Sequence, residues 1–202
     1  MKKVWLITRV DQSVLIANAL LNNKQLSRWD TFIVFKEKYK SILRKFFQIA
    51  DKRFITEELN LYTNKSYTSE IITRFLNVAS YNEANIVGDR LFGFLSSLNK
   101  PNDFSILHCQ AGYGLSTIKK CKKDSNIGIV SDHFGTLKGT LVKQLKDEYS
   151  KFGINFKIHN EKILEQRELE AKLSDKIIVP SSFLANEFIN IGFNKSKIKI
   201  IP

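Results

Sequence analysis

An acidic residue beside a histidine, directly after an apolar run, is the first feature of this sequence that could do chemistry. The run 127–131 is followed by Asp132, His133, Phe134 and Gly135. A histidine can donate a hydrogen bond to a phosphate or hydroxyl group, or take part in proton transfer, because its ordinary pKa lies near neutrality. A lone histidine is more often structural, but its place at the end of an apolar run favours a functional His133.

A glycine-containing loop is the second candidate. The apolar segment 105–109 leads into residues 110–114 (QAGYG), and a helix is expected from Leu115 or Ser116. Glycines let the backbone approach a ligand, and the first N–H groups of a helix suit an anionic or hydroxyl-rich group. A tight turn alone would require the same two glycines. Both interpretations remain open.

Several common chemistries are excluded by the motifs that the sequence lacks. The segment 9–13, after the first apolar run, has no GxGxxG pattern, which disfavours an ordinary dinucleotide site. No Walker A loop, nucleophile elbow or metal-type spacing of His and Cys occurs. Cys109 and Cys121 are the only cysteines, which excludes a disulfide framework and agrees with a reducing compartment. We therefore expect no metal and no cofactor.

Strands and helices that alternate along the chain must position these residues. Runs rich in Val and Ile predict buried strands at 3–8, 31–35, 105–109, 127–131, 176–179 and 197–201. Helical spacing follows the capping-type Asp11, and again follows Ser182 with Gly192 as the stop. The alternation predicts a Rossmann-like α/β fold, in which one parallel sheet has helices on both faces and residues 1–202 form a single domain. Ligands of such sheets bind beyond the carboxyl ends of the strands.

The balance of charge narrows the classes of partner. The chain has 32 Lys and Arg against 20 Asp and Glu, a net charge of +12. Nucleic acid, an anionic membrane surface and a phosphorylated substrate would all be attracted. Most of the excess is Lys, which recognises base edges poorly, so nucleic acid is the least favoured of the three.

Two segments depart from the simple alternation. Residues 36–52 predict a basic amphipathic helix, which either packs on the sheet, the favoured alternative, or touches a membrane. Residues 68–98 predict a helix pair whose aromatic side chains lie in the core. No apolar run is long enough to cross a bilayer, and the amino terminus lacks the apolar core of a signal peptide. We therefore expect a cytoplasmic protein, with the Lys excess available to hold it peripherally at an inner membrane surface.

The carboxyl-terminal half carries a series of motifs that resembles a known family. The motifs are Arg167 and Glu170 on a helix, Ser174-Asp175 at the start of a strand, the strand 177–181 ending in Pro-Ser, Gly192 after a helix, and Lys197–Pro202 (KIKIIP). Upstream, 105–110 and 129–133 fit strands of the same family. Together they resemble the amino-terminal domain of a family 4 glycosyltransferase with the two-domain GT-B fold.

The resemblance implies an enzyme of polysaccharide biosynthesis that transfers a hexose-type sugar from a nucleotide-sugar donor to a glycan or lipid-linked acceptor. Transfer would retain the anomeric configuration and need no metal. In the family, most of the donor site lies in a second domain that follows the position of Pro202, so residues 1–202 alone are expected to show little or no turnover. His133 would be the catalytic residue, in contact with the donor sugar. The substrate-binding residues would be Arg9, Gln110, Gly112, Tyr113, Gly114, Asp132 and Ser181.

One departure from the family pattern and two alternatives accompany this interpretation. Many relatives have glycines in the first loop, and the segment 9–13 has none. A non-catalytic α/β module that binds a glycan or phosphorylated ligand is the main alternative. A nucleic-acid-binding protein is the last, and it predicts affinity that falls steeply with salt.

Overall fold

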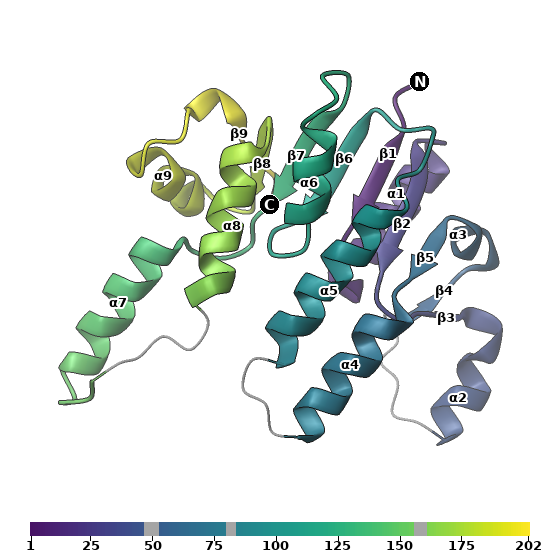
Figure 1. Cartoon of the computed structure of the whole chain (residues 1–202), viewed down its shortest axis with the longest axis horizontal. Helices are drawn as coiled ribbons and strands as arrows, with labels where there is room; N and C mark the ends of the chain where they lie inside the picture. Colours follow the sequence, from purple (N-terminus) through teal and green to yellow (C-terminus); the bar gives the residue numbers. More distant parts are fainter. Residues whose placement is uncertain (47–52, 80–83, 156–160) are drawn as a thin grey trace.

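The parallel sheet expected from the sequence forms the centre of the molecule (Figure 1). The computed structural model describes residues 1–46, 53–79, 84–155 and 161–202. The sheet has seven strands in the order β5-β2-β1-β6-β7-β8-β9, all of them parallel. The strands are β1 (Val4–Ile7), β2 (Leu26–Thr31), β5 (Thr63–Lys65), β6 (Ile106–Gln110), β7 (Gly128–Asp132), β8 (Lys176–Val179) and β9 (Ile198–Ile200). A small separate sheet pairs β3 (Phe35–Lys36) with β4 (Phe54–Ile55).

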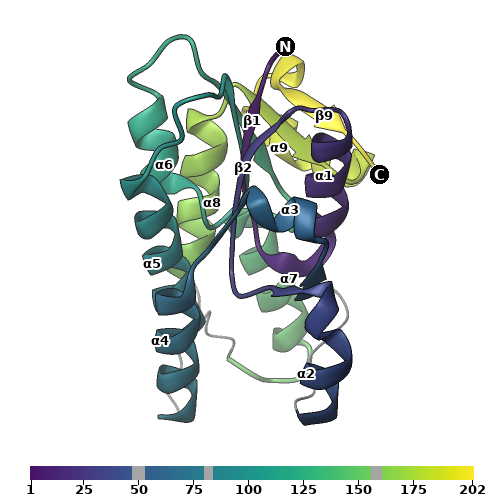
Figure 2. The same cartoon turned by 90° about the vertical axis from the view of Figure 1, so that its right-hand side faces the viewer.

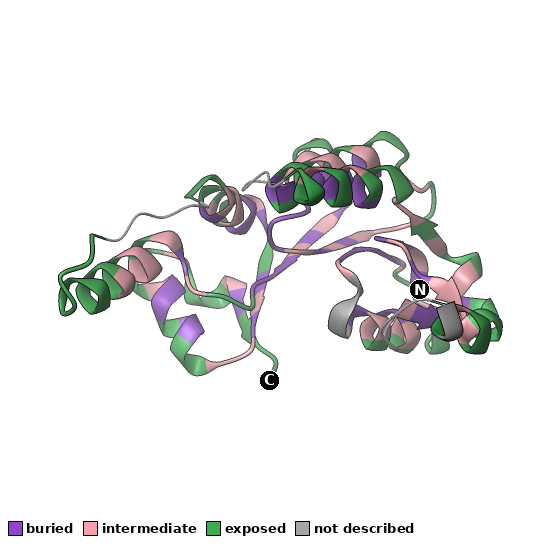
Figure 3. Cartoon of the chain, turned by 90° about the horizontal axis from the view of Figure 1, so that it is seen from below, coloured by how far each residue is buried: buried purple, intermediate pink, exposed green. Residues whose placement is uncertain are grey.

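Helices cover both faces of the large sheet (Figures 2 and 3). One side carries α1 (Val10–Asn22), α2 (Lys40–Phe46) and α3 (Glu57–Leu61). On the other side α4 (Tyr67–Val78), α5 (Ala84–Leu98), α6 (Leu115–Cys121) and α8 (Glu161–Leu173) pack in a row. The helix α7 (Lys138–Ser150) packs against α8, and α9 (Ser182–Asn190) packs on β8 and β9. The α/β fold class is therefore confirmed.

The core explains why the central strands were visible as apolar runs. All four residues of β1 are buried, and β6 and β7 lie beside it in the middle of the sheet. Their side chains join Trp5, Trp29, Phe32 and Phe92 in the main hydrophobic cluster. A second cluster surrounds Phe188 of α9. Burial on both faces of a parallel sheet produces such continuous Val- and Ile-rich strands.

The prediction of a strand at 31–35 was wrong. The strand β2 ends at Thr31, and the buried Phe32 and Val34 lie in the loop that follows it. The true strand was hidden because its interior carries Arg28 and Asp30, whose charged groups pair at 2.8 Å. Asp30 also accepts a hydrogen bond from the indole N–H of Trp5 at 2.9 Å. A buried ion pair on a central strand therefore breaks the apolar pattern without breaking the strand.

Helix ends follow the sequence in one case and depart from it in another. The helix α1 begins at Val10, so Asp11 lies inside its first turn and is not its cap. In α9 the cap is Ser181, whose hydroxyl accepts from the Leu184 N–H. Gly192 lies two residues beyond the end of that helix with a positive φ, as its predicted stopping role requires.

The helices α2 and α4 expose apolar side chains that the sequence placed in the core. Phe92 is fully buried as expected, but Phe75 is 71% exposed and Phe94 is 51% exposed. Ile42 of α2 is exposed as well. The helix expected over 36–52 is observed as far as Phe46, and residues 47–52 lie outside the described part of the chain. Among the described residues, no helix has the length and apolar composition needed to span a bilayer.

Candidate functional site

A polar cavity lies where the central strands β1, β6 and β7 end. Because the strands are parallel, their carboxyl ends meet at one edge of the sheet, and the loops that follow them surround a common space. A cavity of about 310 Å³ there is lined by Thr8, Arg9, Ser13, Ile16, Gln110, Asp132 and Phe134. A smaller pocket of about 50 Å³ shares Gln110, Asp132 and Phe134 with it and adds Ala111, His133, Gly135 and Arg167. We call these two adjoining spaces the strand-end cleft.

The cleft unites residues that are far apart in sequence. The backbone N–H of Arg9 donates to the Gln110 side-chain oxygen at 3.0 Å, which joins the end of β1 to the end of β6. Asp132 pairs with Gln110 across the β6–β7 ladder. Four predicted site residues, Arg9, Gln110, Asp132 and His133, therefore line one cleft, and their roles toward a substrate stay predictions.

The carboxyl of Asp132 forms the polar floor of the cleft together with His108. His108 was expected to be a satisfied core histidine, and this was wrong: its side chain is 14% exposed, and its Nε2 has no hydrogen-bond partner in the described part of the chain. That Nε2 lies 3.6 Å from Asp132 Oδ2. Asp132 Oδ1 is buried and likewise lacks a hydrogen-bond partner among the described residues. Such atoms can bind a substrate hydroxyl, because a bound ligand would satisfy them.

His133 is a neutral imidazole held in place by packing. Its ring is 2% exposed and lies edge-on to Phe188, with 5.1 Å between ring centroids. Its Nε2 lies 3.1 Å from the Ser131 hydroxyl. Burial, with the nearby Arg167 guanidinium, lowers the pKa of His133 to about 3. At physiological pH the residue can therefore exchange a hydrogen bond with a hydroxyl, but it carries no positive charge to offer a phosphate.

The glycine loop after β6 is occupied by a side chain of the protein itself. The N–H groups of Gly112, Gly114 and Leu115 all donate to the buried carboxylate of Glu170 on α8. Gly112 has φ +103°, and a Cβ on Gly114 would overlap the side chain of Cys109. The tight-turn interpretation thus has direct structural support, and these N–H groups are engaged by Glu170.

Two of the predicted binding residues serve visible structural roles. Tyr113 is buried between Phe32 and Phe92, with ring centroids 6.3 Å and 6.1 Å away. Ser181 caps α9 and is absent from the lining of the strand-end cleft. Their assignment to substrate binding remains a prediction that this arrangement does not favour.

The structure adds two charged residues that motif analysis did not assign to the site. Arg167 lines the smaller pocket, and Asp89 on α5 is 5% exposed at the same edge of the sheet. Burial raises the pKa of Asp89 to about 6, although Arg9 and Arg167 act in the opposite direction. In the sequence, the one signal for Asp89 is a carboxylate inside the otherwise apolar segment IVGDRLFGF.

Metal-binding clusters were also sought in the structure. Within residues 1–46, 53–79, 84–155 and 161–202, no three His, Cys, Asp or Glu side chains are grouped so that they could hold a metal ion. The chemistry available at the strand-end cleft is therefore that of guanidinium, carboxyl, amide and imidazole groups.

Comparison with known proteins yields structural neighbours only. No protein-family model matches the sequence, and no curated protein is significantly similar to it. The UDP-GlcNAc 2-epimerase of Methanocaldococcus jannaschii is 12% identical, with a TM-score of 0.47, over 98% of this chain and 45% of that chain. S. aureus MnaA, in a co-structure with UDP, is 16% identical, with a TM-score of 0.49, over 99% of this chain and 44% of that chain. Medicago truncatula UGT71G1, complexed with UDP-glucose, is 10% identical, with a TM-score of 0.42, over 99% of this chain and 51% of that chain. The chain thus spans about half the length of each of these structures.

Proposed function

We propose that this chain is the acceptor-side half of a retaining glycosyltransferase with the GT-B fold. The parent enzyme would transfer a sugar from a nucleotide-sugar donor to a hydroxyl of a glycan or lipid-linked acceptor. In this proposal residues 1–202 form one Rossmann-like domain and supply one wall of the active site. The motifs in 167–202, the parallel sheet and the cleft at its strand ends support this assignment.

One observation carries the proposal: the strand-end cleft combines unsatisfied polar atoms with an apolar wall. A sugar presents hydroxyl groups at its edges and C–H groups on its ring faces. Asp132 Oδ1 and His108 Nε2 lack partners among the described residues and suit hydroxyl groups, and Phe134 and Ile16 provide apolar surface. A cavity of about 310 Å³ is at the lower end of the range for small-molecule sites, and it suits a single sugar ring.

The test is ligand binding by the cleft, followed by transfer. Nucleotide sugars and short glycans are screened by ligand-observed NMR against the wild type, Asp132→Asn and the matched control Asp103→Asn on the exposed surface. Loss of one charge-assisted hydrogen bond is expected to weaken sugar binding about tenfold in Asp132→Asn. Asp103→Asn, whose carboxyl contacts Lys3 at the surface, is expected to bind as the wild type does.

Two results would count against the proposal. Equal binding by Asp132→Asn and the wild type would remove the cleft as the sugar site. Sugar binding through Asp132, with no transfer when the full-length gene product is supplied with every donor and acceptor in the panel, would identify a non-catalytic glycan-binding module. Where transfer occurs, NMR of the product anomer tests retention.

The proposal includes contact between the enzyme and an anionic membrane that carries a lipid-linked acceptor. Ile71, Phe75 and Val78 are exposed on α4, and the chain carries a net charge of +12. Exposed apolar side chains on a cationic protein favour an anionic lipid surface. Co-sedimentation with vesicles of phosphatidylglycerol and phosphatidylcholine tests this. Phe75→Ser is expected to reduce the bound fraction, and equal binding by the two proteins would contradict the contact.

A further inference from the structure

Arg167 presents an unpaired guanidinium to the smaller pocket of the strand-end cleft. Its Nε is buried and has no hydrogen-bond partner in the part of the chain that the structure describes. The group lies between two loops, because a Cβ on Gly112 would be 3.4 Å from Nε and a Cβ on Gly135 would be 3.7 Å from Nη1. Glycine at both positions keeps the space around the guanidinium open.

Arg9 approaches the same edge of the sheet from the end of β1. Its guanidinium lies 5.2 Å from the centroid of the Phe32 ring. Burial acts to lower the pKa of Arg9, but the Tyr113 hydroxyl and the Asp89 carboxyl raise it above its ordinary value, so the group is fully charged. No ion pair with a described carboxylate involves Arg9 or Arg167.

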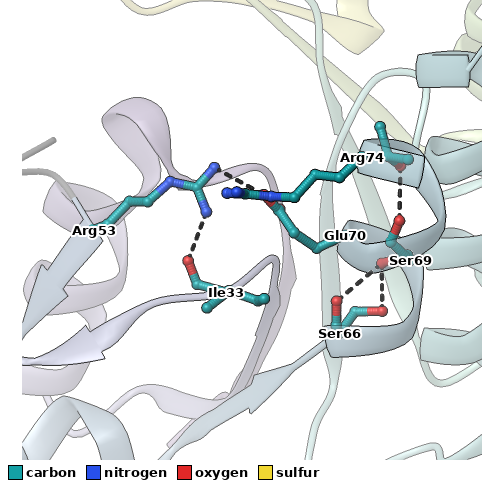
Figure 4. Close-up of polar contacts among 7 residues, drawn as sticks. Ile33, Arg53, Ser66, Ser69, Glu70 and Arg74 are labelled. Carbon is teal, nitrogen blue, oxygen red and sulfur yellow. Dashed lines mark hydrogen bonds and ion pairs between the residues drawn. The ribbon is translucent and has the colours of Figure 1, made fainter. Parts of the chain in front are cut away.

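The nearest acidic groups do not neutralise these two arginines. Glu70 is committed elsewhere: Arg74 contacts it at 3.0 Å and Arg53 at 3.4 Å, and Arg53 also donates to the Ile33 carbonyl (Figure 4). Asp89 is close enough to interact electrostatically with Arg9 and Arg167, but within the described residues it forms no hydrogen bond and no ion pair with them. Two guanidinium groups thus share one weakly ionised carboxyl, and their surroundings carry a net positive charge.

We infer that Arg9 and Arg167 bind the terminal phosphate of a phosphorylated acceptor, with Asp89 as the counter-charge that the phosphate replaces. This deepens the proposed function and rests on it, because it assigns the acceptor to the phosphomonoesters. A guanidinium matches phosphate oxygens with paired N–H donors. The pocket beside Arg167, about 50 Å³, is far too small for a nucleotide and suits one tetrahedral group. The larger cavity, continuous with it, would hold the rest of the acceptor.

Titration with inorganic phosphate and with glycerol 3-phosphate, at constant ionic strength, tests the inference. Arg167→Gln is expected to weaken binding of both about 10- to 100-fold, as for the loss of a charge-assisted pair. Arg90→Gln is the matched control, because Arg90 is exposed on α5 next to Asp89 and outside the lining of the strand-end cleft. Asp89→Asn is expected to tighten binding, because the competing negative charge is removed.

Further arms keep the outcomes distinct. Arg167→Lys retains charge but loses the paired donors, so intermediate affinity supports the site even where Arg167→Gln unfolds. Equal weakening by Arg90→Gln and Arg167→Gln would reveal only general electrostatic attraction and overturn the inference. UDP binding that depends on Arg167, with glycerol 3-phosphate binding that does not, would assign the arginines to the donor and overturn the acceptor assignment.

The inference and the proposed function can fail separately. Phosphate binding that depends on Arg167, in a full-length protein that transfers no sugar, leaves the site intact and refutes the transferase. Transfer to an unphosphorylated acceptor at equal rates in the wild type and Arg167→Gln leaves the transferase intact and refutes the phosphate site.

Discussion

Replacing Asp89 with asparagine is expected to stabilise the protein at neutral and alkaline pH. The substitution keeps the size of the side chain and removes its charge. Asp89 is almost completely buried in α5, and no hydrogen bond from the described residues compensates its desolvation. Attraction to Arg9 and Arg167 offsets that desolvation only in part. The ionised carboxylate is therefore a net cost of folding.

The size of the effect follows from the pKa of Asp89, which burial raises from 3.8 to about 6. One pKa unit corresponds to about 1.4 kcal/mol, so the ionised carboxyl costs about 3 kcal/mol. Because the folded-state pKa is raised, this group's stabilising contribution is complete below pH 3.8 and is lost as the pH rises through about 6. Asp89→Asn and the wild type should thus differ little at pH 4, and the variant should be about 2–3 kcal/mol more stable at pH 8.

Urea unfolding followed by tryptophan fluorescence measures this difference, because Trp5 and Trp29 are both buried. The free energy of unfolding is determined at several values between pH 4 and pH 8 for the wild type, Asp89→Asn and the exposed control Asp103→Asn. The control should follow the wild type throughout. A variant that is destabilised at pH 8, or that differs from the wild type by the same amount at every pH, would refute the reasoning.

Three further substitutions test the surroundings of the cleft in the same unfolding assay. Glu170→Ala leaves three backbone N–H groups without their acceptor and should cost about 3–5 kcal/mol, and a loss under 1 kcal/mol would show that water replaces the carboxylate. Gly93→Ala places a Cβ against the backbone carbonyl of Tyr113 and should cost about 2 kcal/mol, whereas Gly139→Ala, with open space around it, should gain about 0.5–1 kcal/mol. The reverse order of these two would contradict the close packing of α5. Ser181→Ala removes the hydroxyl that caps α9 and should cost about 1 kcal/mol, with Ser181→Thr close to the wild type.

The strands that sequence reasoning located are those whose burial is complete. The strand β1 and the strands near the carboxyl terminus stand out because both faces of the sheet are covered there. The strand β2 was missed because the paired charges of Arg28 and Asp30 interrupt its apolar pattern. The edge strand β5 has the sequence Thr-Asn-Lys and carries no apolar signal at all. Hydropathy thus detects the interior of the sheet and misses charged pairs and edges.

The candidate site divides in the same way between what sequence shows and what only packing shows. Residues directly after strands, such as Arg9, Gln110 and Asp132, could be nominated because parallel topology fixes where strand ends lie. Asp89 and Arg167 come from helices, and their approach to the cleft depends on how α5 and α8 pack on the sheet. The engagement of the glycine loop by Glu170 also depends on α8, so no local pattern near Gly112 could reveal it.

The pairing of β1 with β6 has a consequence for the order of folding. Val4 lies opposite Ile106, so the middle of the sheet closes only after about a hundred intervening residues have been synthesised. Until then β1 can pair with β2, but the hydrogen bond from Arg9 to Gln110 cannot form. On a ribosome, the first half of the chain would emerge with one side of its central strand unpaired and open to wrong partners. Completion of the cleft therefore coincides with closure of the sheet, and a ligand of the cleft would act as a late folding aid for the whole domain.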